Sequence, residues 1–199
     1  MHFQNQAHFS DPDSFRRAQG VNLNPKTAFT DRKGNVLFYA QTGGIMRPDR
    51  HELKPGTSIF RFGSNSDSTA KVAAGSWWIE REEFDKIIRF GEIHGLSVGM
   101  AMRALCLVPP EWSDATLLVR ANVVEPLLAW RGLGNSVITP ADGDGPLVRI
   151  PHQNDFAARR LHQLFIPGLY NDAQVRSALQ IEAEFSLSKS EGVRGWVYV

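Results

Sequence analysis

The stretch from residue 57 to residue 84, TSIFRFGSNSDSTAKVAAGSWWIEREEF, changes from the hydrophobic period of a strand to that of a helix. A short apolar strand is expected at Ser58–Phe60, and a polar loop at Asn65–Thr69. After Trp78 the apolar residues recur at helical spacing, with acidic residues between them. Acidic side chains in the first turn suit the positive end of the helix dipole. The fold must therefore accommodate a strand and a helix within one short segment.

The rest of the sequence places helices early and strands late. We expect a second helix at Ser97–Leu107, ended by the prolines that follow it. Residues 126–130 are expected to form a short helix or turn, and later apolar runs to form strands at 117–124, 164–166, 179–187 and 195–199. This order favours an α+β fold over alternating βαβ units. We expect two small packed sheets with a helical pair, over about residues 80–107, on one side.

Length and composition are those of an ordinary globular chain. With 199 residues, the chain suits one domain, 51–199, preceded by an N-terminal extension, 1–50, that carries a small hairpin. Hydrophobic residues make up 42% of the chain and charged residues 22%, which allows a core without disulfides or metals. The net charge of +1 provides no general basic field for nucleic acid. No apolar run reaches the roughly 20 residues of a membrane span, and the N-terminus lacks the pattern of a secretory signal.

The sequence gives little support for metal or nucleophile chemistry. The six histidines are not paired at a ligand spacing. The motifs Gly-x-Ser-x-Gly, Gly-x-x-x-x-Gly-Lys and Gly-x-Gly-x-x-Gly are absent, which disfavours hydrolase, phosphate-loop and dinucleotide-fold chemistry. The single cysteine, Cys106, excludes an internal disulfide and lies in an apolar run, where a buried and inert thiol is expected.

The candidate site combines the cation at the end of the first strand with the tryptophan pair. Arg61 precedes Gly63, where a ligand can approach the backbone. A simpler interpretation makes Arg61 a surface residue and both tryptophans core residues. Adjacent strand residues point to opposite faces, however, so one core cannot simply bury Trp77 and Trp78 together. A guanidinium suits phosphate and an indole suits a flat ring, so the pattern predicts a pocket for a flat anionic molecule. The candidate binding residues are Arg61, Phe62, Gly63, Ser64, Gly75, Ser76, Trp77 and Trp78.

This arrangement resembles the NAD-binding core of the ADP-ribosyltransferase superfamily, over roughly residues 57–90 and 160–187. The shared features are a strand ending in an arginine between aromatic residues, then a Gly-Ser-aromatic segment that leads into a helix. The resemblance implies that NAD is the substrate, that Arg61 contacts its phosphate or ribose side, and that the segment around Ser76 supports the nicotinamide half. The superfamily's catalytic strand is matched by residues 163–168, with Gln163 in place of the usual glutamate.

The resemblance leaves several candidates for the catalytic group. The amide of Gln163 can hydrogen-bond a ribose hydroxyl, but it cannot stabilise an oxocarbenium cation by charge. Glu182 and Glu184, on the following strand, are candidates for the missing carboxylate. The chain is also similar to the Arg-Glu-Ser family of NAD-degrading toxins, whose Gly-Gly-Arg-Trp segment is matched by residues 75–78. In that comparison the family's glutamate is Glu82 or Glu83.

The implied activity is transfer of ADP-ribose from NAD to a macromolecular acceptor, expected to be a protein. The enzyme would be effector-like or toxin-like, would act in its own cytoplasm or that of a target cell, and would need neither a metal nor a membrane. The alternative within this class is an NAD glycohydrolase toxin.

Two interpretations from other classes also stand. An adaptor would use exposed tryptophans on a convex surface: Trp77, Trp78, Trp112 and Trp130. A nucleic-acid-processing factor would need one stripe of arginines: Arg103, Arg120, Arg131, Arg149, Arg159 and Arg160.

Overall fold

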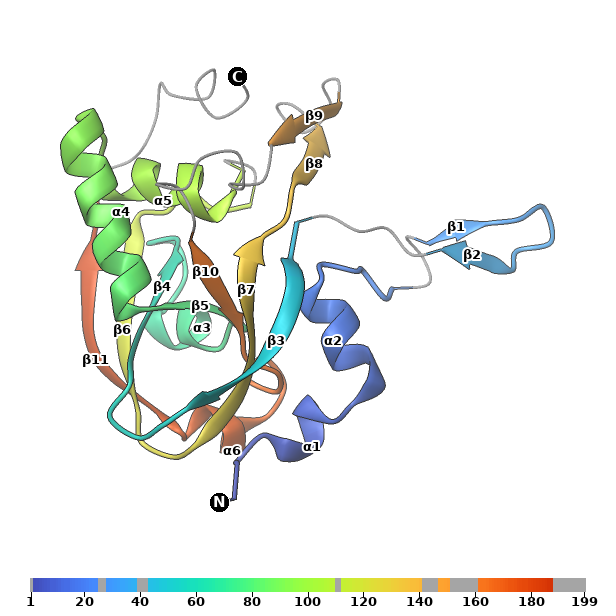
Figure 1. The fold of residues 1–199 in the computed structure, drawn as a ribbon, viewed down its shortest axis with the longest axis horizontal. Coiled ribbons are helices and arrows are strands. Elements are labelled where there is room, and N and C mark those ends of the chain that lie inside the picture. Colours follow the sequence, from blue (N-terminus) through green and yellow to red (C-terminus); the bar gives the residue numbers. More distant parts are fainter. Residues whose placement is uncertain are drawn as a thin grey trace.

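The computed structural model describes residues 2–24, 28–38, 43–109, 112–140, 147–150 and 161–187. Seven strands form one antiparallel sheet in the order β11-β6-β4-β5-β10-β7-β3 (Figure 1). In chain order they are β3 (Ile45–Leu53), β4 (Ser58–Gly63), β5 (Trp77–Glu80), β6 (Leu117–Val123), β7 (Leu127–Gly134), β10 (His162–Phe165) and β11 (Leu179–Ser186). Two separate ladders pair β1 (Phe29–Thr30) with β2 (Val36–Phe38), and β8 (Val137–Pro140) with β9 (Leu147–Ile150). The strand expected at 195–199 lies outside the described residues.

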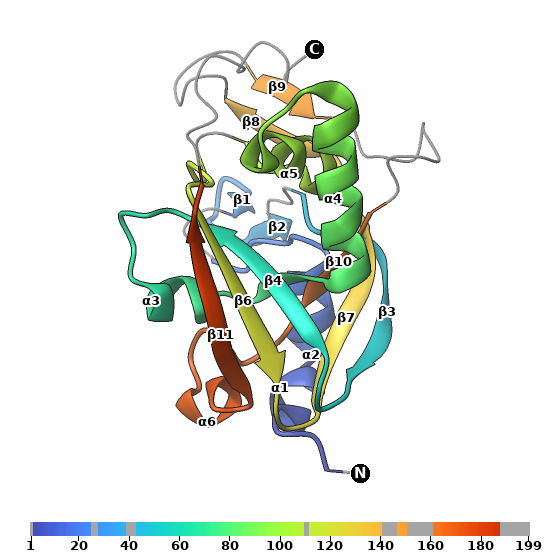
Figure 2. The same ribbon diagram turned by 90° about the vertical axis from the view of Figure 1, so that its left-hand side faces the viewer.

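The short strand β5 divides the large sheet into two halves, because it changes partner along its length. Trp77 and Trp78 pair with β10, whereas Ile79 and Glu80 pair with β4. Each neighbour therefore separates from β5 along half of the strand. The first half-sheet contains β11, β6 and β4, and the second contains β10, β7 and β3 (Figure 2).

One core lies between the two half-sheets. A single cluster of buried side chains includes Ile59 and Val119 from the first half-sheet, Leu127 and Leu164 from the second, and Trp78 from β5. Removing such apolar surface from water is the main term that stabilises a fold, at roughly 25 cal/mol per Å². The α+β class is therefore confirmed. The two packed sheets expected from the sequence correspond to these halves, which β5 joins into one sheet.

Helices lie mainly on the outer faces of the half-sheets. They are α1 (Gln6–Phe9), α2 (Pro12–Ala18), α3 (Thr69–Ala73), α4 (Arg81–His94), α5 (Val98–Cys106) and α6 (Ala173–Arg176). The exceptions are α3 and α6, which contribute Val72 and Val175 to the core between the half-sheets. The apolar sides of α4 and α5 pack on Phe60 and Ile79. Gly95 ends α4 with a φ of 63°, and Ser97 begins α5 by accepting a hydrogen bond from the Met100 backbone N–H. The helical pair expected on one side of the sheets is confirmed.

The N-terminal residues pack on the second half-sheet. Phe9 stacks on Trp130 with ring centroids 4.3 Å apart. The side chain of Asn5 is fully buried and hydrogen-bonds both the N–H and the carbonyl oxygen of Leu128 at 2.8 Å. The boundary expected between residues 50 and 51 lies inside β3, so the N-terminal segment contributes a strand and helices to the same body.

Residues 127–134 form β7, and the short helix or turn expected at 126–130 is wrong. Leu127, Leu128 and Ala129 are all fully buried, since both faces of the strand are covered. A strand buried on both faces has no alternation of polar and apolar residues, so its period does not distinguish it from a buried helix.

Five charged or titratable side chains, which we call the charged cluster, connect the two half-sheets. Glu80 of β5 contacts His51 of β3 and Arg131 of β7, each at 3.0 Å. Glu83, buried in the first turn of α4, lies 3.4 Å from His162 Nδ1 and 3.6 Å from Arg131 Nη2. The charged cluster therefore ties β5 and α4 to all three strands of the second half-sheet. Burial, aided by the positive charge of Arg131, lowers the pKa of His162 below its ordinary value of 6.5.

Acid should weaken the fold through His162. Because the pKa of His162 is lower in the folded chain than in the unfolded chain, the free energy of unfolding should fall as the pH drops below 6.5. Thermal unfolding between about pH 8 and pH 5 should show this decline, and His162→Gln should flatten it. His2→Gln, at an exposed histidine, is the control. A His162→Gln profile identical to that of the unmodified chain would exclude His162 as the source.

Candidate functional site

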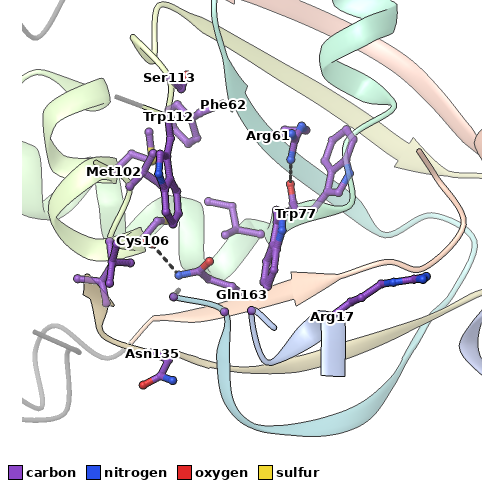
Figure 3. Close-up of a pocket in the computed structure, with 18 of the residues that line it drawn as sticks. Arg17, Arg61, Phe62, Trp77, Met102, Cys106, Trp112, Ser113, Asn135 and Gln163 are labelled. Carbon is purple, nitrogen blue, oxygen red and sulfur yellow. Dashed lines mark hydrogen bonds between the residues drawn. The ribbon is translucent and has the colours of Figure 1, made fainter. Parts of the chain in front are cut away.

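A cavity of about 410 Å³ lies where β4 separates from β5 (Figure 3). This volume falls within the range of roughly 300–1,000 Å³ that small-molecule sites occupy. Its wall combines β4 and β5 with the ends of α2 and α5 and with β10, which are far apart in the sequence. The polar, aromatic and sulfur-containing residues of the wall are Arg17, Arg61, Asn22, Ser113, Asn135, Gln163, Phe60, Phe62, Trp77, Trp78, Trp112, Met102 and Cys106.

Arg61 brings a positive charge to this cavity from a partly buried side chain. The β4–β5 ladder ends at the pair Phe60–Ile79, and beyond it Arg61 Nη1 donates to the Trp77 carbonyl oxygen at 2.5 Å. Among the described residues Arg61 has no carboxylate partner, and its Nε is buried without a hydrogen-bond acceptor. Burial lowers the pKa of Arg61 to about 10. Because buried charges are normally paired, an anion in the cavity would be strongly favoured.

Gly75 makes room for the Arg61 guanidinium. A Cβ atom at residue 75 would overlap the guanidinium, so any other residue would force the Arg61 side chain out of this position. Phe62 lies in the cavity wall. Three other residues that the sequence predicted for the site make contacts outside the wall. Gly63 packs against Val72, and Ser64 hydrogen-bonds Ser66 at 2.8 Å. The Ser76 carbonyl oxygen accepts a hydrogen bond from the Ile166 N–H at 2.8 Å.

The two tryptophans differ in burial, as alternation along a strand predicts. Trp78 is 2% exposed, and its Nε1 donates to the Gly75 carbonyl oxygen at 2.7 Å. Trp77 is partly exposed and packs edge-on against Phe165, with ring centroids 5.1 Å apart. Both residues contribute atoms to the cavity wall, because the separation of β4 from β5 opens the space beside β5.

Gln163 lies in the cavity wall, while Leu164 and Ile166 are buried in the core. The Gln163 Nε2 donates to the Cys106 carbonyl oxygen at 3.0 Å, which ties β10 to the end of α5. A glutamate at this position would lose the hydrogen bond, and its carboxylate would face a carbonyl oxygen instead. The contact therefore supplies a physical reason for an amide here.

The alternative carboxylates do not share a site with Arg61. Glu182 and Glu184 lie on β11, at the far edge of the sheet, where they contact an arginine of β6 and a threonine of α3. Glu83 is buried in the charged cluster, and Glu82 is exposed on α4. Among the described residues that line the cavity there is no aspartate or glutamate. Sequence proximity to Gln163 or Trp78 does not bring these carboxylates to the wall of the cavity.

Some wall residues were not predicted to belong to the site. Arg17 comes from the N-terminal helix α2, and Trp112, which is 50% exposed, precedes β6. Cys106 also lies in the wall, and burial together with the negative charge of Glu83 raises the pKa of its thiol to about 12. Such a thiol is almost never ionised near neutral pH, which agrees with the inert role expected for it. No local pattern marks Arg17 or Trp112 as neighbours of Arg61.

No protein-family model matches the chain, and no curated protein matches its sequence. Among solved structures, it is similar to a chain of "Rhs1-CT in complex with cognate immunity protein RhsI1", with 11% sequence identity and a TM-score of 0.39. The similarity covers 78% of this chain and 89% of that chain. A similarity this distant assigns neither a family nor an activity.

In the described part of the chain, no group of three or more His, Cys, Asp and Glu side chains is placed to hold a metal ion. The described helices are all too short or too polar to cross a bilayer.

Replacing Arg61 should separate ligand binding from folding. Arg61→Met removes one hydrogen bond but also a partly buried charge without a counter-ion, so the unfolding midpoint should change little. Affinity for ADP, used as a flat anionic probe, should fall at least tenfold, or by about 1.4 kcal/mol. Calorimetric titration and thermal unfolding measure the two effects, with Arg81→Met at an exposed arginine of α4 as the control. If Arg61→Met alone unfolds the protein, Arg61 serves the fold and not a ligand.

Gln163→Glu should destabilise the protein by about 1–3 kcal/mol at neutral pH, because a carboxylate cannot donate to the Cys106 carbonyl oxygen. The loss should shrink at acid pH, since a protonated carboxyl can donate again. Urea unfolding at about pH 7 and pH 4 tests both statements, with Gln180→Glu on the exposed face of β11 as the matched control. Equal stability of the two variants at neutral pH would show that the hydrogen bond contributes nothing.

Proposed function

We propose that this chain is an NAD-dependent ADP-ribosyltransferase, an effector-like or toxin-like enzyme that cleaves NAD and transfers ADP-ribose to a macromolecular acceptor, expected to be a protein. The observation behind the proposal is that Arg61, a partly buried cation without a described counter-ion, shares one cavity with Trp77. The resemblance of the surrounding segments to the ADP-ribosyltransferase superfamily supports the same conclusion.

The charge and the flat rings of NAD suit the residues that line this cavity. Its diphosphate is an anion that would compensate the charge of Arg61 and recover part of the cost of burying it. The partly exposed indole of Trp77 offers apolar surface to a flat ring, which is present in both halves of NAD. A ligand that is anionic in the middle and aromatic at its ends therefore suits a partly buried arginine beside tryptophan.

The proposed reaction depends mainly on how NAD and its acceptor are positioned. The bond between the nicotinamide nitrogen and ribose C1′ breaks, its electron pair leaves with nicotinamide, and nicotinamide departs uncharged. The acceptor then attacks C1′ and gives up a proton. Because the leaving group needs no protonation, holding NAD and its acceptor in line supplies much of the rate enhancement. Gln163 lies in the wall, and the resemblance to the superfamily implies that it would lie beside the ribose.

An NAD glycohydrolase is the second candidate within this class. The cavity wall is not sealed, since Trp112 is half exposed and Trp77 partly so. Water that enters the cavity would replace the macromolecular acceptor.

The other two classes receive less support from the described side chains. Of the four tryptophans that an adaptor would present, Trp78 is buried, Trp77 lies in the cavity and Trp130 stacks on Phe9. A stripe of arginines would need Arg103, which is 3% exposed and donates to backbone carbonyl oxygens. Arg149, Arg159 and Arg160 lie outside the described side chains.

Incubation with NAD tests the proposal directly. Nicotinamide release should be detectable, and label from adenine-labelled NAD should appear on a macromolecule when cell lysate is added. Arg61→Met should abolish both signals. Release of nicotinamide without transfer would favour the glycohydrolase. If NAD neither binds nor loses nicotinamide, with or without lysate, the proposal is overturned and the adaptor interpretation replaces it.

A further inference from the structure

A β-hairpin leaves the body of the protein from the wall of the cavity. Its strands are β1 and β2, and in Figure 1 they extend away from the half-sheets. The segment that carries the hairpin begins after Val21 and Asn22 and ends before Gly43 and Gly44, and these four residues all line the cavity. A molecule bound by the hairpin is therefore held close to the cavity.

Backbone contacts fix the point where this segment returns to the body. Gly44 passes so close to the Gln19 backbone that a Cβ atom at residue 44 would overlap it, and its φ of 81° suits glycine. The Gly44 carbonyl oxygen accepts a hydrogen bond from the Asn135 N–H at 2.8 Å, and the Gly43 N–H donates to the Ser136 carbonyl oxygen at 3.2 Å. Because Asn135 also lines the cavity, the base of the segment and the wall are packed together.

The turn at the tip of the hairpin is held in shape by Asp31. Its carboxylate accepts hydrogen bonds from the backbone N–H groups of Lys33 and Asn35, at 2.8 and 2.9 Å, and from the Asn35 side chain at 2.9 Å. Gly34 completes the turn with a φ of 83°. The turn exposes both Arg32 and Lys33. Because the turn is already ordered, these cations lose less conformational freedom when they bind a partner.

Two aliphatic side chains follow the cationic turn. Val36 is 41% exposed and Leu37 is 64% exposed. Leu37 is the extra residue of a β-bulge, because Thr30 pairs with Val36 whereas Phe29 pairs with Phe38. A bulge changes the direction of a side chain, which here leaves the leucine in solvent. Apolar side chains rimmed by polar ones are a feature of protein-binding surfaces, whereas nucleic acid is contacted chiefly through cations, hydrogen bonds and aromatic stacking.

We propose that the β1–β2 hairpin is the docking surface for the macromolecular acceptor, and that this acceptor is a protein with acidic side chains around an apolar spot. Arg32 and Lys33 attract its carboxylates, and Val36 and Leu37 pack on its apolar side chains. Since the hairpin segment starts and ends in the cavity wall, a docked acceptor is held near the bound NAD. This inference deepens the proposed function and rests on it for the partner's role as acceptor.

Fluorescence anisotropy tests docking in the absence of any reaction. The probes are three labelled chains of equal length: a peptide that alternates glutamate with leucine, the same peptide with lysine in place of glutamate, and a single-stranded RNA. The acidic peptide should bind most tightly, and added salt should weaken its binding. The double substitution Arg32→Gln/Lys33→Gln and the single substitution Leu37→Ser should each weaken it at least about fivefold.

Matched controls lie on α4, on the opposite side of the molecule from the hairpin (Figure 1). Arg81→Gln/Arg89→Gln removes the same charge from exposed positions, and Ile93→Ser replaces an apolar side chain that is 71% exposed. Both control variants should bind the acidic peptide normally, and thermal unfolding confirms that every variant is folded. Equal losses in the hairpin and α4 variants would mean a general effect of charge or hydrophobicity and would overturn the inference.

Three other results would overturn it as well. The first is an acidic peptide that does not bind the unmodified protein. The second is an acidic peptide that binds the hairpin variants and the unmodified protein equally. The third is an RNA that binds more tightly than the acidic peptide and loses affinity in Arg32→Gln/Lys33→Gln, which would identify nucleic acid as the partner.

Activity measurements separate this inference from the proposed function. The hairpin variants should release nicotinamide from NAD alone at the unmodified rate, because the substituted residues do not line the cavity. Transfer of label to lysate proteins should fall at least about fivefold, in step with docking. If the acidic peptide docks on the hairpin but NAD loses no nicotinamide, with or without lysate, the docking surface stands and the transferase proposal fails. If label transfer is undiminished in the hairpin variants, the transferase proposal stands and the docking surface fails.

Discussion

The structure depends on how β5 divides its hydrogen bonds between two neighbours. This strand has four residues and pairs two of them with β10 and two with β4. A buried backbone group left unpaired costs about 1–3 kcal/mol, so each separation needs a substitute for the missing ladder. On one side the substitute is the hydrogen bond from Arg61 to the Trp77 carbonyl oxygen. On the other side the charged cluster around Glu80 and Glu83 connects the strands and α4.

The cavity is a consequence of this division. A continuous β4–β5 ladder would leave no space beside Trp77. In such a ladder, alternation along β4 would direct the Arg61 side chain to the face opposite Phe60 and Phe62. Because the ladder stops at Phe60, Arg61 turns toward β5, and Gly75 leaves the space that its guanidinium occupies. The guanidinium satisfies one carbonyl oxygen but keeps its positive charge and a free Nε. The same side chain therefore satisfies a carbonyl oxygen of β5 and keeps a positive charge beside the cavity.

Local elements could be predicted from this sequence, whereas the contacts between distant elements could not. The hydrophobic period and the capping residues of α4 and α5 can be recognised within each helix and its flanks. Gln163 and Leu164 lie on opposite faces of β10, as alternation along a strand predicts. The partner of Gln163 is the carbonyl oxygen of Cys106, 57 positions away, and nothing local indicates it. The approach of Arg17 to the cavity depends in the same way on Gly44 passing against the end of α2. Such contacts join segments through the sheet, so only the folded chain reveals them.

The amide at Gln163 affects the balance between binding of the substrate and stabilisation of the transition state. If NAD occupies the cavity as proposed, the positive charge of Arg61 would stabilise its diphosphate but would oppose the cation that develops at the ribose. Interactions that hold substrate and transition state equally well lower KM without raising kcat. A carboxylate beside the ribose would stabilise the developing cation. The Cys106 carbonyl oxygen, however, disfavours a carboxylate at residue 163. Under the proposed function, such a site would bind its nucleotide firmly and would gain speed when a negative group arrives with the acceptor, which would tie fast turnover to the presence of the correct target.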